Sequence, residues 1–381
     1  MAYRKIKTCL FIAFLLFFLP FTSNNAFASE NKKDFDAGSY IIDHVVDSYG
    51  WHITTIGGHA ISIPLPIILF DNGKFICFMS NKLHHGEAAY KGYALGFTPE
   101  TEKQIVKLTE PVTGHLHEVP QIDSQAKIID ISITKNVCSL LIGICLLAWI
   151  FISIAKSYKR RENMAPKGLQ SFLEPVILFV RDEVAIPSIG KKKYEKYFPY
   201  LLTLFFFILI NNLMGLIPLF PGGANVTGNI AITGILALIT FFITTFSSNK
   251  NYWKHIFNTP GVPWWLKFPV PLMPLVEFIG VFTKPFTLMI RLFANITAGH
   301  IMILGFIGLI FIIGEMNTGF GFAVAPVSLF FYLFMGLIEL LVAFIQAFVF
   351  TLLTAIYIGM ATEEHHTEEH TTVHELTQTK E

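Results

Sequence analysis

The sequence predicts an all-α polytopic membrane protein with about five membrane-crossing helices, the last two long and tilted. An interfacial amphipathic helix and a small extracytoplasmic N-terminal region complete the predicted architecture. Of the 381 residues, 53% are hydrophobic and only 14% are charged, and the mean hydropathy is +0.55. The charged residues lie between apolar runs long enough to cross a hydrocarbon core of roughly 30 Å. This composition excludes an ordinary soluble domain, and the formal net charge of +1 gives no reason to expect a nucleic-acid partner.

Residues 1–28 have the pattern of a secretory signal peptide. A basic start is followed by the apolar run Cys9–Phe21 and by the small-x-small sequence Ala26-Phe27-Ala28. The apolar run is short for a spanning helix, although an uncleaved anchor stays an alternative. We therefore expect the chain that follows to lie outside the cytoplasmic membrane.

Residues 29–136 are polar, contain no spanning run and form the predicted extracytoplasmic region. Alternating apolar residues in Ile61–Phe70 and Lys74–Met79, with Asp71-Asn72-Gly73 between them, predict a β-hairpin. Seven of the thirteen histidines fall in this region, but their spacings match no metal-ligand template, and the four cysteines of the chain are scattered. We expect exposed or structural histidines rather than a metal site, and no cofactor.

The membrane domain is predicted to cover residues 137–361. Its first spanning run is Val137–Ala155, and the basic cluster directly after it marks the cytoplasmic end. The following segment, Gly168–Ile189, is amphipathic and is interrupted by Pro175 and Pro187. We expect this segment to lie at the membrane interface rather than to cross it.

Four further apolar segments complete the membrane domain. Tyr197–Leu219 and Ile230–Phe246 lead out and back, whereas Pro271–Gly314 and Pro326–Met360 are too long for simple spans. As helices they would measure about 66 Å and about 52 Å. Because lipid excludes exposed loops at depth, these two must be tilted or partly interfacial. The polar tail, residues 362–381, is then expected in the cytoplasm.

Arg291 lies near the middle of an apolar stretch, at a depth where an ionised side chain is costly and is a functional candidate by default. At 100° per residue, Lys284, Thr287 and Asn295 share its helix face, which small or flexible residues continue. Glu277 lies near this stripe but fourteen residues away, and no second buried carboxylate of this chain faces Arg291 at helical spacing. We therefore expect the counter-ion of Arg291 on another protein. The alternative is that Arg291 snorkels, or pairs structurally with Glu277 or Glu339.

Titratable groups lie on both sides of this cation. Glu277 precedes Arg291 by fourteen residues, near the same stripe, whereas His300 follows it by nine on the opposite face. Glu339 and Gln346 share a face of the last helix. Groups that take up and release protons, separated by a fixed positive charge, are what a gated proton path needs. A simpler alternative is that His300 and Gln346 only brace the helices.

The residues around Arg291 resemble those of a known family, subunit a of the membrane sector of F-type ATP synthases. Lys284 to His300 reads Lys-Pro-Phe-Thr-Leu-Met-Ile-Arg-Leu-Phe-Ala-Asn-Ile-Thr-Ala-Gly-His, and Ile345 to Leu353 reads Ile-Gln-Ala-Phe-Val-Phe-Thr-Leu-Leu. The first run resembles the arginine helix of the family, and the second resembles its last helix. Two further patches, Asn212 to Pro218 and Asn225-Val226-Thr227, are similar as well. The resemblance covers about residues 135–365.

The resemblance implies a role for each candidate residue. Arg291 would face the carboxylate of a c-subunit ring, with Asn295 and Gln346 lining that contact, and Glu277 would lie in the cytoplasmic half-channel. Asn212, Glu339 and His300 would form the outer half-channel.

Two positions depart from the pattern of many members of the family. His300 and Glu339 are exchanged relative to some members, which predicts that they are neighbours. Gly215 stands where many members carry an acid, so the outer half-channel would rely more on the residues named above for it.

The resemblance also implies the setting: a non-catalytic, multi-pass subunit of the bacterial inner membrane, in contact with lipid, the c-ring and the b-subunit peripheral stalk. The N-terminus would lie outside and the C-terminus in the cytoplasm. Three alternatives stay open. They are a sodium-translocating version of the same subunit, a solute–ion transporter with its own pocket around Arg291, and a membrane scaffold in which the buried charges are structural.

Overall fold

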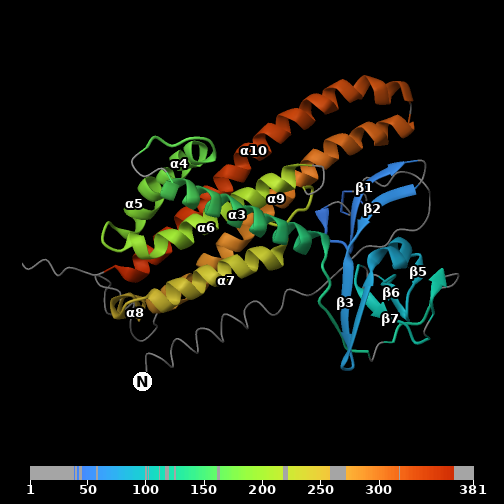
Figure 1. The fold of residues 1–381 in the computed structure, drawn as a ribbon, viewed down its shortest axis with the longest axis horizontal. Coiled ribbons are helices and arrows are strands. Elements are labelled where there is room, and N and C mark those ends of the chain that lie inside the picture. The colour runs from blue at the N-terminus through green and yellow to red at the C-terminus, as the bar shows by residue number, and fades with distance from the viewer. Residues whose placement is uncertain are drawn as a thin grey trace, which may run out of the picture.

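The computed structural model describes residues 38, 41–42, 45–56, 59–98, 101, 103–110, 112–115, 120–123, 126–160, 164–217, 222–257, 272–316 and 318–363. The predicted signal peptide lies outside the described residues, as do most of the predicted tail and the family-like Pro218. Within the described ranges the chain comprises a β-rich N-terminal part and a helical part (Figure 1). We call the described residues from 45 to 134 the N-terminal module.

Five helices of the described chain are long and apolar enough to cross a membrane, which confirms the predicted class. They are α3 (Lys135–Arg160), α6 (Tyr194–Leu216), α7 (Ile230–Ser247), α9 (Leu272–Met316) and α10 (Thr318–Thr362). As predicted, the last two are longer than a simple span, since each has 45 residues. Figure 1 shows α9 and α10 running side by side well beyond the ends of α6 and α7.

The start of α10 was predicted too late, because Pro326 lies inside the helix and not at its beginning. The extra turns are stabilised by contact with the end of α9. A Cβ atom on Gly321 would lie only 2.7 Å from the Cα atom of Gly314. The two glycines therefore let the helix backbones touch where the hairpin turns.

The amphipathic segment is not among the five candidate spans, but its predicted break at Pro175 was wrong. It forms α4 (Leu169–Phe179), a π-helical turn (Val180–Ala185) and α5 (Ile186–Ile189), with Pro175 inside α4. Val180 and Val184, in the π-helical turn, are fully buried in two apolar clusters shared with α6 and α10. This packing offsets the one backbone hydrogen bond that the proline removes.

A short helix, α8 (Lys250–Phe257), was not predicted. Its Trp253 and Ile256 are buried in a cluster with Phe241 of α7 and Phe282 of α9. The Trp253 indole also donates a 2.7 Å hydrogen bond to the hydroxyl of Ser248. The eight residues are amphipathic, but an isolated helix of this length is not stable in water, so these contacts stabilise it.

The N-terminal module consists of antiparallel strand pairs. The strands are β1 (Gly50–Ile56), β2 (His59–Pro64), β3 (Pro66–Asp71), β4 (Lys74–Met79), β5 (Ala88–Ala89), β6 (Tyr93–Leu95), β7 (Ile105–Lys107), β8 (Gly114–His115) and β9 (Ile128–Asp130), with a 3₁₀ segment at Ser80–Gly86. The pairing is β1–β2, β4–β3–β9, β5–β8 and β6–β7.

The predicted hairpin is confirmed as β3 and β4, which pair in register from Pro66↔Met79 to Asp71↔Lys74. Asn72 and Gly73 form its turn with φ of 48° and 81°, the positive values that a two-residue type I′ turn requires. The first predicted strand is shorter than expected. Ile61–Pro64 belongs to β2, and buried Leu65 separates β2 from β3.

The module is attached to the helices at the beginning of α3. Asp47 accepts hydrogen bonds from the Asn136 backbone N–H at 2.9 Å and from the Thr134 hydroxyl at 2.7 Å. An acceptor and a negative charge at this position stabilise a helix N-terminus. Beside it, Trp51 of β1 packs on Ala224 and Val226, in the turn between α6 and α7.

Candidate functional site

Arg291 lies on an open face of α9. Its side chain is exposed, as are those of Thr287, Asn295 and Ala298 along the same stripe, and Met302 is 50% exposed. Across the described ranges, no carboxylate lies within ion-pairing distance of Arg291. The predicted face therefore exists, and it is turned away from the rest of the chain.

His300 points the other way, into the contact between α9 and α10. Its Nδ1 atom lies 2.6 Å from Oε1 of Glu339 and 3.1 Å from the Ile296 carbonyl oxygen. The side chains of His300 and Glu339 are only 14% and 4% exposed. The structure thus brings together the two residues that the exchanged pattern predicts as neighbours.

Two glycines make room for this pair. A Cβ atom on Gly299 would lie 2.8 Å from Glu339 Oε1 and 3.0 Å from its Cδ, so the carboxylate rests directly on the α9 backbone. On the other side, a Cβ atom on Gly215 of α6 would lie 3.4 Å from Nε2 of His300 and 3.3 Å from the Ala224 carbonyl oxygen. The imidazole is therefore enclosed by α6, α9 and the turn after α6.

Asn212 connects α6 to α10 one helical turn from Glu339. It is 2% exposed, and its Nδ2 donates a 3.2 Å hydrogen bond to the Ala343 carbonyl. Its Oδ1 accepts a 2.6 Å bond from the hydroxyl of Thr227. Thr227 was not predicted as a site residue, because the turn between α6 and α7 has no periodicity that would bring it to Asn212.

Gln346 lies on the same buried face of α10 as Glu339, as predicted, with exposed fractions of 7% and 4%. Because α9 and α10 are antiparallel, a position nine residues before His300 on α9 lies beside a position nine residues after Glu339 on α10. These two positions are Arg291 and residue 348. Gln346 is therefore level with Arg291. Lys284 should then be level with position 355, and its ammonium indeed lies 5.5 Å from the Tyr357 ring centroid.

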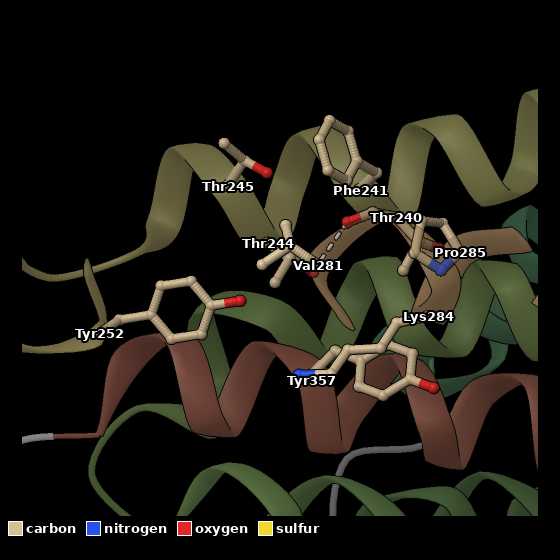
Figure 2. A pocket seen from close by; sticks show the side chains of 9 residues that line it. All are labelled: Thr240, Phe241, Thr244, Thr245, Tyr252, Val281, Lys284, Pro285 and Tyr357. Atoms are coloured by element: carbon tan, nitrogen blue, oxygen red, sulfur yellow. Dashed lines mark hydrogen bonds between the residues drawn. The ribbon is translucent and has the colours of Figure 1, made fainter. Parts of the chain in front are cut away.

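A small cavity lies beyond Lys284, between α7, α8, α9 and α10 (Figure 2). Its volume is about 20 Å³, which is enough for a water molecule. It is lined by Thr240, Phe241, Thr244, Thr245, Tyr252, Val281, Lys284, Pro285 and Tyr357. Figure 2 shows Lys284 beside Tyr357 at one end and Tyr252 at the other. This cavity could not be predicted from the sequence, because its walls come from four separate helices.

Glu277 lies close to this cavity. Its charge acts on both Tyr252 and Lys284. Burial, and then the Glu277 carboxylate, raise the pKa of Tyr252 in α8 to about 12. Glu277, Lys284 and Arg291 follow one another at intervals of seven residues, about 10 Å along the helix axis, so Glu277 and His300 flank the arginine from opposite directions.

No group of three or more histidine, cysteine or acidic side chains in the described residues is arranged to hold a metal ion. Of the cysteines, Cys77 and Cys145 are exposed and Cys138 is partly buried, and all three are free thiols. The acid–base groups of the candidate site are thus a buried His–Glu pair and a separate carboxylate, with Arg291 between them.

Residues 137–359 match the family model of the ATP synthase A chain, a match that covers more than half of the sequence and contains every candidate site residue. The chain belongs to the ATP synthase A chain family. Members of this family are membrane-sector subunits rather than catalytic ones. Residues 40–131, which include most of the N-terminal module, match a domain of unknown function, DUF8433.

Several bacterial members of the ATP synthase A chain family are similar over most of their length. Subunit a of Chloroherpeton thalassium is 43% identical over 249 residues, which cover 63% of this chain and 70% of that protein. Subunit a 2 of Chlorobaculum tepidum is 46% identical over 247 residues, 63% and 66% of the two chains. Subunit a of Myxococcus xanthus is 42% identical over 267 residues, 68% and 82%.

Proposed function

We propose that this chain is the proton-conducting stator subunit of a rotary F-type ATP synthase, in which two offset half-channels open onto a c-subunit ring. The observation that carries this proposal is the opposite placement of the charges on α9. Arg291 is exposed on the open face without a carboxylate partner in the described chain, whereas His300 and Glu339 are paired in the interior. The missing counter-ion is a carboxylate of the ring.

The outer half-channel runs along Asn212, His300 and Glu339. The imidazole nitrogen and the carboxylate oxygen lie 2.6 Å apart, and both groups can take up and release protons. Asn212 holds α10 and the turn after α6 in place through its bonds to Ala343 and Thr227. From this pair the proton passes to the ring carboxylate at the open face of α9.

The cytoplasmic half-channel contains Glu277 and the cavity beside Lys284. Threonine and tyrosine hydroxyls line that cavity and supply hydrogen-bond partners for water. Glu277 is fourteen residues from Arg291, about 21 Å along the axis. A proton released from the ring near Arg291 is therefore conducted through the cavity towards Glu277.

Arg291 separates the two paths. A guanidinium does not lose its proton in proteins, so it repels a proton that would cross directly from His300 to Glu277. It attracts the ionised ring carboxylate instead. Asn295, on its exposed face, and Gln346, level with it on α10, border that contact. Each ring carboxylate must then be protonated from one side and deprotonated on the other.

Basic residues support an orientation with the N-terminus outside and the C-terminus in the cytoplasm of a bacterial inner membrane. Lys159 and Arg160 end α3. Lys193, before α6, donates a 2.8 Å bond to the carbonyl of Thr362 at the end of α10. The basic segments therefore lie at the same end as the C-terminus of α10, and an excess of lysine and arginine marks the cytoplasmic side. A b-subunit stalk would hold the chain against the ring.

The test is Arg291→Ala in the assembled enzyme, reconstituted in proteoliposomes. We expect ATP synthesis driven by a proton gradient to be lost, while the exposed Ile312→Ala variant of the same helix assembles and works normally. Coupled synthesis by Arg291→Ala would overturn the proposal. If passive proton flow were unchanged in a double variant, His300→Ala with Glu339→Gln, these two residues would not form the outer half-channel. Synthesis driven by a sodium gradient in the presence of an uncoupler would show the sodium version instead.

A further inference from the structure

The three-stranded sheet of the N-terminal module has two apolar faces. One face carries Ile67 and Leu69, both fully buried, against Tyr93 of β6 and Ile105 of β7. The other face is exposed. Phe75, Phe70 and Ile129 form one cross-strand row of this outer face, with exposed fractions of 68%, 41% and 58%.

The remaining side chains of the outer face are apolar too. Ile68 pairs with Cys77 and accepts a backbone hydrogen bond from Ile131, and Pro66 pairs with Met79. Cys77 is exposed, Met79 is 42% exposed and Ile131 is 62% exposed. An antiparallel sheet with one face in water normally alternates apolar and polar residues, and a contiguous exposed apolar patch marks an interaction site.

The outer face is held close to the membrane. Ile131 is four residues before the start of α3, a distance of at most about 13 Å along the chain. The bonds of Asp47 to Thr134 and Asn136 fix this connection. Figure 1 shows β3 lying across the ends of the helices, with β6 and β7 on the side of β3 away from α3. The face opposite β6 and β7 is therefore the one turned towards the membrane.

We propose that the outer face of the β4–β3–β9 sheet rests on the lipid surface, with Phe70, Phe75 and Ile129 in the headgroup–acyl boundary. We favour lipid over a protein partner because the outer face is continuous with α3, a spanning helix with exposed apolar side chains. After Ile131 the chain enters α3, whose Leu141 and Trp149 are 48% and 63% exposed. Asp71, Lys74 and Asp130 lie on the other face of the three strands, and an apolar face without charged side chains fits the boundary region of a bilayer.

Native Cys77, on the edge strand β4, places a probe on this face, in the row next to Phe75, Phe70 and Ile129. The test uses the assembled enzyme in lipid nanodiscs, with Cys9, Cys138 and Cys145 replaced by alanine and a nitroxide label on Cys77. Collision with oxygen, which dissolves in lipid, is compared with collision with a water-soluble nickel chelate. The matched control carries the label at Glu87→Cys in a Cys77→Ser background. Glu87 is exposed next to β5, on the other side of the module.

We expect the oxygen-to-nickel collision ratio to be several-fold higher at Cys77 than at position 87. A ratio equal to that of the control would show a face in water and would overturn the proposal. Low collision rates with both reagents would show a face covered by protein, either a neighbouring subunit or a second copy, and would overturn it as well.

A second variant avoids changing the cysteines. Phe75→Trp keeps the position aromatic, and lipids brominated near the headgroup should quench its fluorescence more than that of a Lys91→Trp control. Equal quenching of the two variants would contradict lipid contact.

Discussion

Gly299→Ala tests whether the carboxylate of Glu339 must rest directly on the α9 backbone. The added Cβ atom would lie 2.8 Å from Oε1 and 3.0 Å from Cδ, whereas unstrained contacts are about 3.5 Å or longer. Glu339 would have to retreat by roughly 0.5–0.7 Å, away from the histidine nitrogen that now lies 2.6 Å from it. Overpacking of this kind costs about 1–3 kcal/mol.

A cost of that size lowers the population of the paired arrangement by a factor of about 5–150. The assay is passive proton flow through the membrane sector, and ATP synthesis, in proteoliposomes. Gly280→Ala and Gly305→Ala are matched controls, because each adds the same methyl group to the same helix with nothing within 4 Å. We expect normal flow in both controls and a decrease of at least several-fold in Gly299→Ala.

The refuting result is specific. Proton flow in Gly299→Ala equal to that of the two controls, in complexes assembled to the same extent, would show that the close contact between His300 and Glu339 does not limit transport. A loss of assembly in Gly299→Ala alone would show a packing role for Gly299, and the transport role of the pair would then depend on the His300→Ala, Glu339→Gln variant.

Three further variants test contacts elsewhere in the chain. Thr227→Val leaves the buried Oδ1 of Asn212 without its 2.6 Å donor, so we expect the free energy of unfolding to fall by about 1–3 kcal/mol. The thermal midpoint of the complex should decrease, and an unchanged midpoint would show that this hydrogen bond does not stabilise the fold. Hydrogen bonding from Lys107 lowers the pKa of Asp71, so its stabilisation of the N-terminal module should be complete above the ordinary pKa of about 3.9 and decrease as the pH falls through the lower folded value. Limited proteolysis against pH should show that decrease in the native protein, and its absence in Asp71→Asn. Trp51→Ala removes a side chain that is 3% exposed and should cost about 3–5 kcal/mol, seen as faster hydrogen exchange in the turn after α6; exchange as slow as in the native protein would exclude Trp51 as the anchor of the module.

The spanning helices and the hairpin could be predicted because local rules decide them. A bilayer requires long apolar helices, so Val137–Ala155 and Ile230–Phe246 already lay within α3 and α7. Asn72-Gly73 favours a two-residue turn whatever surrounds it. By contrast, α8 is amphipathic but too short to be stable alone, and it depends on Trp253 reaching a cluster formed by α7 and α9.

In the candidate site, too, the features set by helix periodicity could be predicted, and those that depend on contacts between distant segments could not. Helix periodicity placed Arg291 and Asn295 on one face of α9, and Glu339 and Gln346 on one face of α10, because 3.6 residues per turn determines both. The bond between Asn212 and Thr227 joins a helix to an irregular turn and could not be predicted from spacing. The cavity beside Lys284 required four helices in contact, which only the folded chain provides.

Gly215 and the His300–Glu339 pair, where the sequence departs from the pattern that the family resemblance implies, lie in contact with one another. With histidine on α9, the imidazole extends to within 3.4 Å of where a Cβ atom on Gly215 would be, so an acid at that position would occupy the space of the ring. With glutamate on α10, the carboxylate reaches Nδ1 of His300 at 2.6 Å and already supplies the negative charge. Gly215→Asp should therefore lower proton flow in this chain. In a His300→Ala background, where flow is already low because the imidazole is missing, it should cause no further decrease. Equal impairment in both backgrounds would show that the crowding involves the Ala224 carbonyl, 3.3 Å from the same Cβ position, rather than the histidine.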